Sequence, residues 1–216
     1  MIGKDEIILK ILEIEWKMFE KVSSIDGNAV CQEDPETFRI MRTSQAMSWS
    51  VETLESYLRD LETAQEDGRN LMTEKYARMM ASTSPLEFEK FVHSLPILAP
   101  EVLSLIEKIV TIILKWEEDL LREFPNVVKR GRPLHSSEDS VNVTSLETYL
   151  RGELATYSRR TLELYHDHVS KQESENINGS EITLEKTVKQ YGYASLKVAN
   201  DMLNPPKGNN HNGPKM

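Results

Sequence analysis

A glutamate lies on the apolar face of a strongly amphipathic segment in the second half of the chain. The segment TSLETYLRGELATYSRRTLELYHDH, residues 144–168, predicts one long helix. At about 100° per residue, Glu153 falls within ~60° of the centre of a stripe formed by leucines and Tyr157. Burying an unpaired carboxylate costs several kcal/mol, so we expect Glu153 to meet a cation or a ligand.

Two other predicted helices also turn polar side chains towards the core. Over residues 4–22, Glu15 falls among apolar residues that repeat with helical spacing. Over residues 34–49, Arg42 and Gln45 share a face with large apolar side chains. Three helices therefore each direct a charged or amide group inward.

The sequence leaves two interpretations of these groups open. In the first they form a structural network, in which Arg42 pairs with Glu15 or Glu153 while Gln45 and Tyr157 complete the hydrogen bonding. In the second, Arg42 binds an anion and a glutamate with a raised pKa transfers a proton. Helical periodicity alone favours the structural network. The gathering of several such groups in one small domain favours a functional site.

The functional interpretation assigns roles to eight residues. The bound group would be a carboxylate or phosphate, which the arginine fork contacts through two hydrogen bonds. The candidate catalytic residues are Glu153, Glu15 and Tyr157, and the candidate anion-binding residues are Arg42, Gln45, Arg39, Arg69 and Arg151. The sequence indicates no metal site and no particular cofactor.

Two alternative chemistries rest on the same predicted helix over 144–168. Glu163 and His166 have the E-x-x-H spacing of di-iron bundles, but the chain contains no second copy of that pair. Arg160 and His166 resemble the R-x(4–6)-H signature of the HEPN helical ribonucleases.

The single cysteine, Cys31, has no histidine near it in sequence, so we expect it to be buried and inert.

Composition narrows the class of protein. The chain has 216 residues and a net charge of -9, which argues against general nucleic-acid binding. The basic run KRGR at 129–132 is interpreted as solvated charge. The longest apolar stretch is shorter than the ~20 residues of a membrane span, and the first residues lack the pattern of a signal peptide. We therefore expect a cytoplasmic protein that does not enter a membrane.

The periodicity predicts an all-α fold. We expect a single compact domain of about seven or eight helices over 1–203, followed by a disordered tail over 204–216. Helix signals include Asp34 with Pro35, Ser50, and a capping box at Ser84 with Glu87. The expected helices cover 4–22, 34–49, 51–67, 69–80, 84–91, 101–123, 145–168 and 182–203, with a loop over 125–143.

Four stretches together resemble a bacterial family classed as a domain of unknown function: IEWKMF, CQEDPETFRIMRTSQAMSW, GRNLMTEKYARMM and TSLETYLRGELATYS. The resemblance covers nearly the whole chain and ends near residue 200. It implies no established activity, although it favours a nucleotidyltransferase-like protein as partner. The five inward-facing residues all lie within these stretches. Gly152, inside a predicted helix, indicates a close approach by another helix or by a ligand.

Two functional hypotheses follow. The first is an enzyme or binding protein for a small anionic molecule. The second is a non-catalytic helical module that binds another bacterial protein, for which the inward polar groups would satisfy one another and an apolar patch would be exposed elsewhere.

Overall fold

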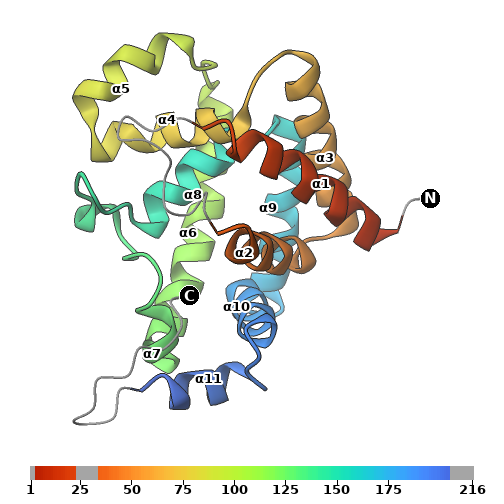
Figure 1. Cartoon of the computed structure of the whole chain (residues 1–216), viewed down its shortest axis with the longest axis vertical. Helices are drawn as coiled ribbons and strands as arrows, with labels where there is room; N and C mark the ends of the chain where they lie inside the picture. The colour runs from red at the N-terminus through yellow and green to blue at the C-terminus, as the bar shows by residue number, and fades with distance from the viewer. Residues whose placement is uncertain (1–2, 23–33, 205–216) are drawn as a thin grey trace.

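The computed structural model describes residues 3–22 and 34–204, and this part of the chain is built from helices (Figure 1). Its only β-type pairing is an isolated bridge between Ser140 and Val143. Two short 3-10 turns, η2 (Val92–Ser94) and η3 (Ser136–Glu138), accompany the α-helices. These are α1 (Lys4–Phe19), α2 (Pro35–Ser48), α3 (Val51–Glu66), α4 (Leu71–Thr83), α5 (Pro85–Phe91), α6 (Pro100–Glu123), α7 (Pro125–Val128), α8 (Leu146–Leu154), α9 (Arg159–Ser174), α10 (Gly179–Gln190) and α11 (Leu196–Met202).

Side-chain caps fix the start of the helices that carry the inward polar groups. Asp34 Oδ1 accepts a hydrogen bond from the Thr37 backbone N–H at 2.9 Å, with Pro35 in the first turn of α2. Ser50 caps α3 in the same way. Both predicted caps are confirmed.

The all-α fold and the single compact domain are confirmed, but the predicted number of helices is wrong. The described residues form eleven α-helices, because two expected helices are each divided and a short α7 occupies part of the expected loop. Ser158 interrupts the segment 145–168: it caps α9, and its backbone N–H donates to Asp60 Oδ2 at 2.9 Å. Gly192, with φ of +90°, separates α10 from α11.

Three further sequence expectations concern the cap at Ser84, the residues outside the described ranges and the absence of a membrane span. The predicted capping box at Ser84 is wrong, because its side chain makes no cap hydrogen bond, although Pro85 does begin α5. Cys31 and all of the tail except Asn204 lie outside the described residues. No helix in 3–22 or 34–204 combines the length and the apolar character that crossing a membrane requires.

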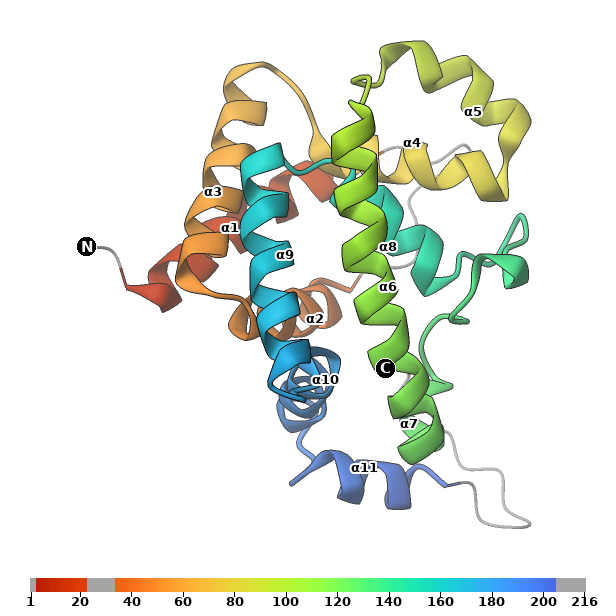
Figure 2. The same cartoon turned by 180° about the vertical axis from the view of Figure 1, so that it is seen from behind.

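Helix α6 runs along the molecule and contacts α8, α9 and α10, as Figure 2 shows. Its buried residues contribute to two hydrophobic clusters, which gives α6 a central position. The larger cluster joins α6 to α1, α3, α4, α8 and α9, and the smaller one joins the end of α6 to α7, α10 and α11. In both views α4 lies towards one end of the molecule and α10 towards the other.

Candidate functional site

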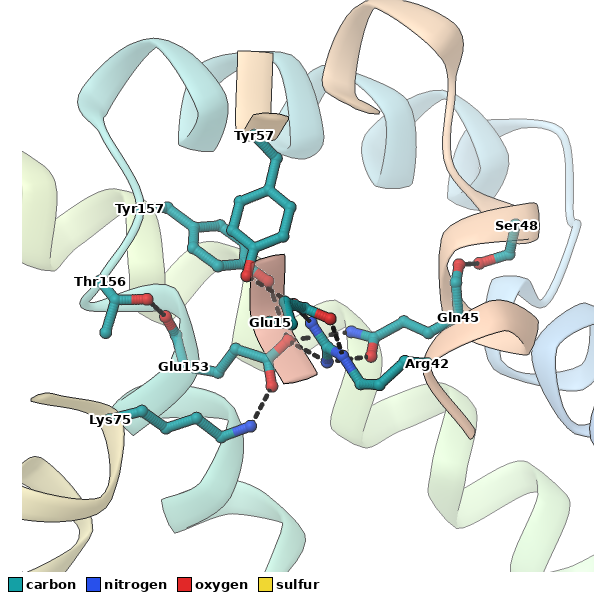
Figure 3. A network of polar contacts seen from close by, with 9 residues as sticks. All are labelled: Glu15, Arg42, Gln45, Ser48, Tyr57, Lys75, Glu153, Thr156 and Tyr157. Carbon is teal, nitrogen blue, oxygen red and sulfur yellow. Dashed lines mark hydrogen bonds and ion pairs between the residues drawn. The ribbon is translucent and has the colours of Figure 1, made fainter. Parts of the chain in front are cut away.

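The guanidinium of Arg42 lies at the centre of a buried polar network (Figure 3). Its Nε donates to Glu15 Oε2 at 2.9 Å and its Nη2 to Glu15 Oε1, so α1 supplies a bidentate partner. Its Nη1 donates to Glu153 Oε1 at 2.8 Å and to Gln45 Oε1 at 2.6 Å. One arginine on α2 therefore joins a carboxylate of α1 to a carboxylate of α8.

The carboxylate of Glu153 accepts four hydrogen bonds. Three reach Oε1: from Arg42, from Gln45 Nε2 at 3.2 Å and from the Tyr157 hydroxyl at 2.8 Å. The fourth comes from Lys75 Nζ on α4, 2.6 Å from Oε2. Glu153 is 3 % exposed, so its charge is balanced by the protein rather than by water.

Glu15 is fully buried and is bound by a second tyrosine. The Tyr57 hydroxyl, from α3, donates to Glu15 Oε1 at 2.7 Å. The rings of Tyr57 and Tyr157 pack with their centroids 4.7 Å apart. Each of the two carboxylates thus accepts hydrogen bonds from a phenol and from the shared Arg42, and Glu153 alone also accepts from Lys75 and Gln45.

Charge within the network is balanced, and it controls the protonation of Glu153. Burial works against the charged carboxylate, but Arg42 and Lys75 outweigh burial and hold the pKa of Glu153 well below its usual range. Burial lowers the pKa of Lys75, an effect that Glu153 partly offsets. In this arrangement Glu153 is therefore ionised at neutral pH.

A cavity of about 450 Å³ adjoins the network. Arg42, Gln45 and Lys75 line it, whereas Glu15, Glu153 and Tyr157 are not among its lining residues. The cationic and amide groups thus border the cavity, and the carboxylates lie behind them. Its volume lies within the ~300–1,000 Å³ range that is typical of small-molecule sites.

The cavity has largely apolar walls and a basic edge. Aromatic and aliphatic side chains from α2, α6, α8 and α9 line it, including Phe38, Trp49, Trp116, Tyr165 and Val169. The exposed residues Arg130 and Arg132, between α7 and α8, also line it.

Tyr149 connects the basic edge to the buried network. Lys75 Nζ lies 3.6 Å from the centroid of its ring and Arg132 Cζ lies 4.8 Å from it. Two cations, one buried and one exposed, therefore meet at a single ring on the cavity wall.

Comparison with known proteins places the chain in a family. A family model described as "Protein of unknown function (DUF4125)" matches residues 5–201. The chain belongs to the DUF4125 family. This confirms the resemblance to a domain of unknown function. The comparisons with curated proteins and with solved structures gave no significant match.

In this DUF4125 protein, three of the arginines expected to bind an anion do not line the cavity. Arg39 is exposed on α2. Arg69 makes two hydrogen bonds of 2.8 Å with Glu74. Arg151 pairs with Glu107 on α6 and, along its own helix, with Glu147. Arg42 and Gln45 are thus the predicted anion-binding residues that the structure brings to the cavity.

Gly152 of the DUF4125 domain allows two helices to approach closely. A Cβ at this position would lie 3.0 Å from the Lys75 carbonyl oxygen and 2.9 Å from Met79 Cγ. The neighbour that the sequence indicated is therefore helix α4. This contact brings Lys75 within reach of Glu153, one residue further along α8.

The residues proposed for metal or nuclease chemistry lie elsewhere on α9. Glu163 pairs with Arg159 at 2.8 Å, and His166 is half-buried with the Ser170 hydroxyl 3.4 Å from its Nε2. Across the described ranges, no group of three or more histidine, cysteine, aspartate or glutamate residues is arranged to hold a metal ion. Arg160 is exposed, and the ribonuclease hypothesis stays a prediction.

Sequence reasoning missed three residues of this DUF4125 protein: Lys75 and Tyr57, which bind the network carboxylates, and Glu117, which lines the cavity. Each carried the signal used for Glu153, a polar group on an apolar helix face. Lys75 lies one turn from both Leu71 and Met79 of α4, which are buried. Applying the helical wheel to every helix would have found all three.

Proposed function

We propose that this DUF4125 protein binds a small anion with an apolar or aromatic body in the cavity between α2, α4, α6, α8, α9 and α10. The observation that carries the proposal is Lys75, a buried ammonium that lines a largely apolar cavity. An ammonium has three N–H donors, and among the described residues Lys75 Nζ makes one hydrogen bond, to Glu153. Nζ also contacts the Tyr149 ring, which leaves one side of the ammonium to donate to an anionic group of a ligand.

The surroundings of Lys75 support the same proposal. Arg132 contacts the same tyrosine ring from the exposed edge of the cavity, which places a second cation where the anionic group enters. Gln45 adds an amide to the cavity wall, and the neighbouring guanidinium of Arg42 adds a positive charge there. The apolar walls would bury the rest of the ligand, which provides most of the affinity at sites of this kind.

Proton transfer by the network is not part of this proposal. Glu153 accepts four hydrogen bonds, and its pKa is held well below the usual range despite burial. Glu15 is bound by Arg42 and Tyr57 and does not line the cavity. The role we propose for both carboxylates is to hold Arg42 and Lys75 in place beside the ligand.

Native mass spectrometry of the protein purified gently from its own cells tests the proposal and reveals the ligand. A bound mass of small-molecule size is expected for the wild type and for the control Arg159→Gln, an exposed arginine that does not line the cavity. It should be absent from Thr183→Phe, which would fill the cavity from α10. Retention of the same mass in a folded Thr183→Phe protein would place the ligand elsewhere.

A fluorescent probe tests the charge requirement independently. Anilinonaphthalene sulfonate, an aromatic anion, should bind wild-type protein in the cavity. Lys75→Met should weaken its binding about tenfold or more, as expected for the loss of a charged hydrogen bond. Arg132→Gln, at an exposed position, should weaken it by a factor of about five or less. Equal affinity in the wild type and in both variants would contradict the proposal.

The second hypothesis, a module that binds another protein, has one observation in its favour. Large apolar side chains are exposed along α5 and the segment after it: Leu86 is 78 % exposed and Ile97 is 99 % exposed. In Figure 1, α5 lies at the edge of the molecule. Co-purification of one protein with the wild type, lost in Leu86→Ser with Ile97→Ser, would support this hypothesis. Unchanged co-purification in that variant would count against it.

A further inference from the structure

The cavity contains a second polar group that the network does not use. Glu117, on α6, lines the cavity together with Gln172 of α9 and Ser180 of α10. Ser180 lies beside the carboxyl group of Glu117 and lowers its pKa. Helix α10 lies towards the opposite end of the molecule from α4, which carries Lys75 (Figures 1 and 2). The cavity therefore has two polar regions, supplied by different helices.

Glu117 differs from the two network carboxylates in lacking a positive partner. Within residues 3–22 and 34–204, no lysine, arginine or histidine nitrogen lies within 4.0 Å of its carboxylate oxygens. Burial raises its pKa, an effect that Ser180 partly offsets. Glu117 is half-buried. A carboxylate that is largely shielded from water and has no cation is costly, which is why such groups are usually paired or bind a ligand.

The other polar groups around Glu117 cannot neutralise it. Gln172 and Ser180 are uncharged. His168, one turn before Gln172 on α9, places its Nε2 2.9 Å from the Ser48 carbonyl oxygen of α2. Glu117 also belongs to no cluster of three metal-ligating side chains within the described residues. A single carboxylate beside a hydroxyl, in an apolar cavity, matches a cationic group with N–H donors better than a metal ion.

We propose that Glu117 and Ser180 form a subsite for an ammonium group, so that the ligand is a zwitterion with an amine at one end and an acid at the other. This inference rests on the proposed function, because the acidic end is the group assigned to Lys75 and Arg132. The ligand's ammonium would supply the charge that Glu117 lacks. The apolar walls would contact the part of the ligand between its two charged ends.

Matched pairs of linear acids test the ammonium subsite. Octanoate and 8-aminooctanoate, with their homologues of six to twelve carbons, differ only in the terminal amine. Each is titrated into the full-length protein by isothermal calorimetry at pH 7. We expect at least one amino acid of the series to bind about tenfold more tightly than its matched plain acid. The length that binds best measures the separation of the two subsites.

Variants separate this inference from the proposed function. Glu117→Gln should remove the preference for the amine while leaving the affinity for the plain acid within about threefold. Glu118→Gln, the same change at the next residue, which does not line the cavity, should leave both affinities unchanged. Lys75→Met should weaken both members of each pair.

The outcomes are distinct. Plain acids that bind as well as their amino counterparts at every length, or a preference that persists in Glu117→Gln, would overturn the ammonium subsite and leave the anion site standing. Absence of binding by both series, together with absence of anilinonaphthalene sulfonate binding, would overturn both proposals.

Discussion

The coupling between Glu153 and Lys75 can be measured as a free energy. Glu153→Gln removes the carboxylate and leaves two buried cations, Arg42 and Lys75, facing one remaining carboxylate. Removing one member of a buried ion pair costs about 3–5 kcal/mol. Lys75→Met removes the cation but leaves Glu153 with three of its four donors, so we expect a smaller loss of about 2 kcal/mol.

The double variant decides whether the charges act as one unit. If the two changes were independent, their effects would sum to about 6 kcal/mol. In the double variant, however, Glu15 and Arg42 remain as a neutral pair and no unpaired cation is buried. We therefore expect a loss of about 3–4 kcal/mol, which corresponds to a coupling energy of at least 2 kcal/mol.

Urea unfolding followed by circular dichroism at pH 7 gives these values for the wild type, the two single variants and the double variant. The exposed pair Arg159 and Glu163 serves as the control, because its coupling should be below about 0.5 kcal/mol. Additive effects of the two network changes, within about 0.5 kcal/mol, would refute the balanced-charge explanation of the network.

Four further predictions concern stability. In the folded protein the pKa of Glu153 is held well below the ~4.3 of a glutamate in the unfolded chain. The ionised carboxylate therefore stabilises the fold fully above that pH, and this stabilisation is lost as the pH falls below it. In urea unfolding between pH 7 and 3, the free energy of unfolding should fall less steeply for Glu153→Gln than for the wild type. Glu117 has the opposite sign, since burial raises its pKa and its ionisation opposes folding, so Glu117→Gln should raise the urea midpoint at pH 7; a lower midpoint would contradict this. Gly152→Ala should destabilise the protein by about 1–3 kcal/mol in the same assay, despite alanine's better helix propensity, because the new methyl group meets helix α4. Ser158→Ala should lower stability by about 1 kcal/mol through loss of the cap of α9, and an unchanged midpoint would show that this cap is dispensable.

The inward direction of the network residues could be predicted from the sequence, because helical periodicity fixes the face on which a side chain lies. Glu15, Arg42, Gln45 and Glu153 all point where the helical wheel placed them. Tyr157 reaches the network for a different reason. It lies beyond the end of α8, in the turn before Ser158, and its hydroxyl still bonds Glu153.

The break between α8 and α9 was hidden by continuous periodicity. Leu162, Tyr165 and Val169 of α9 are buried and continue the apolar spacing of α8. The local signal was Ser158 followed three residues later by Thr161, whose backbone N–H it caps. The apolar spacing continues through this position, so periodicity alone predicts one helix where the capping residue indicates two.

The cavity itself could not be predicted from periodicity. Its walls come from α2, α4, α6, α8, α9, α10 and the loop before α8, and its existence depends on how these elements meet. Residue type alone also does not show which arginines line the cavity. Arg69 and Arg151 are paired with acids of their own or neighbouring helices, which only the tertiary structure reveals.

The network also has a consequence for synthesis on the ribosome. Arg42 and Glu15 are separated by 27 residues, so this pair can form soon after α2 emerges. Lys75 and Arg42 precede Glu153 by 78 and 111 residues. Until α8 leaves the exit tunnel, the part of the chain that has emerged therefore carries a lysine whose counter-ion cannot yet reach it. This part cannot bury Lys75 at low cost, so its helices gain their final packing only after most of the chain has been translated.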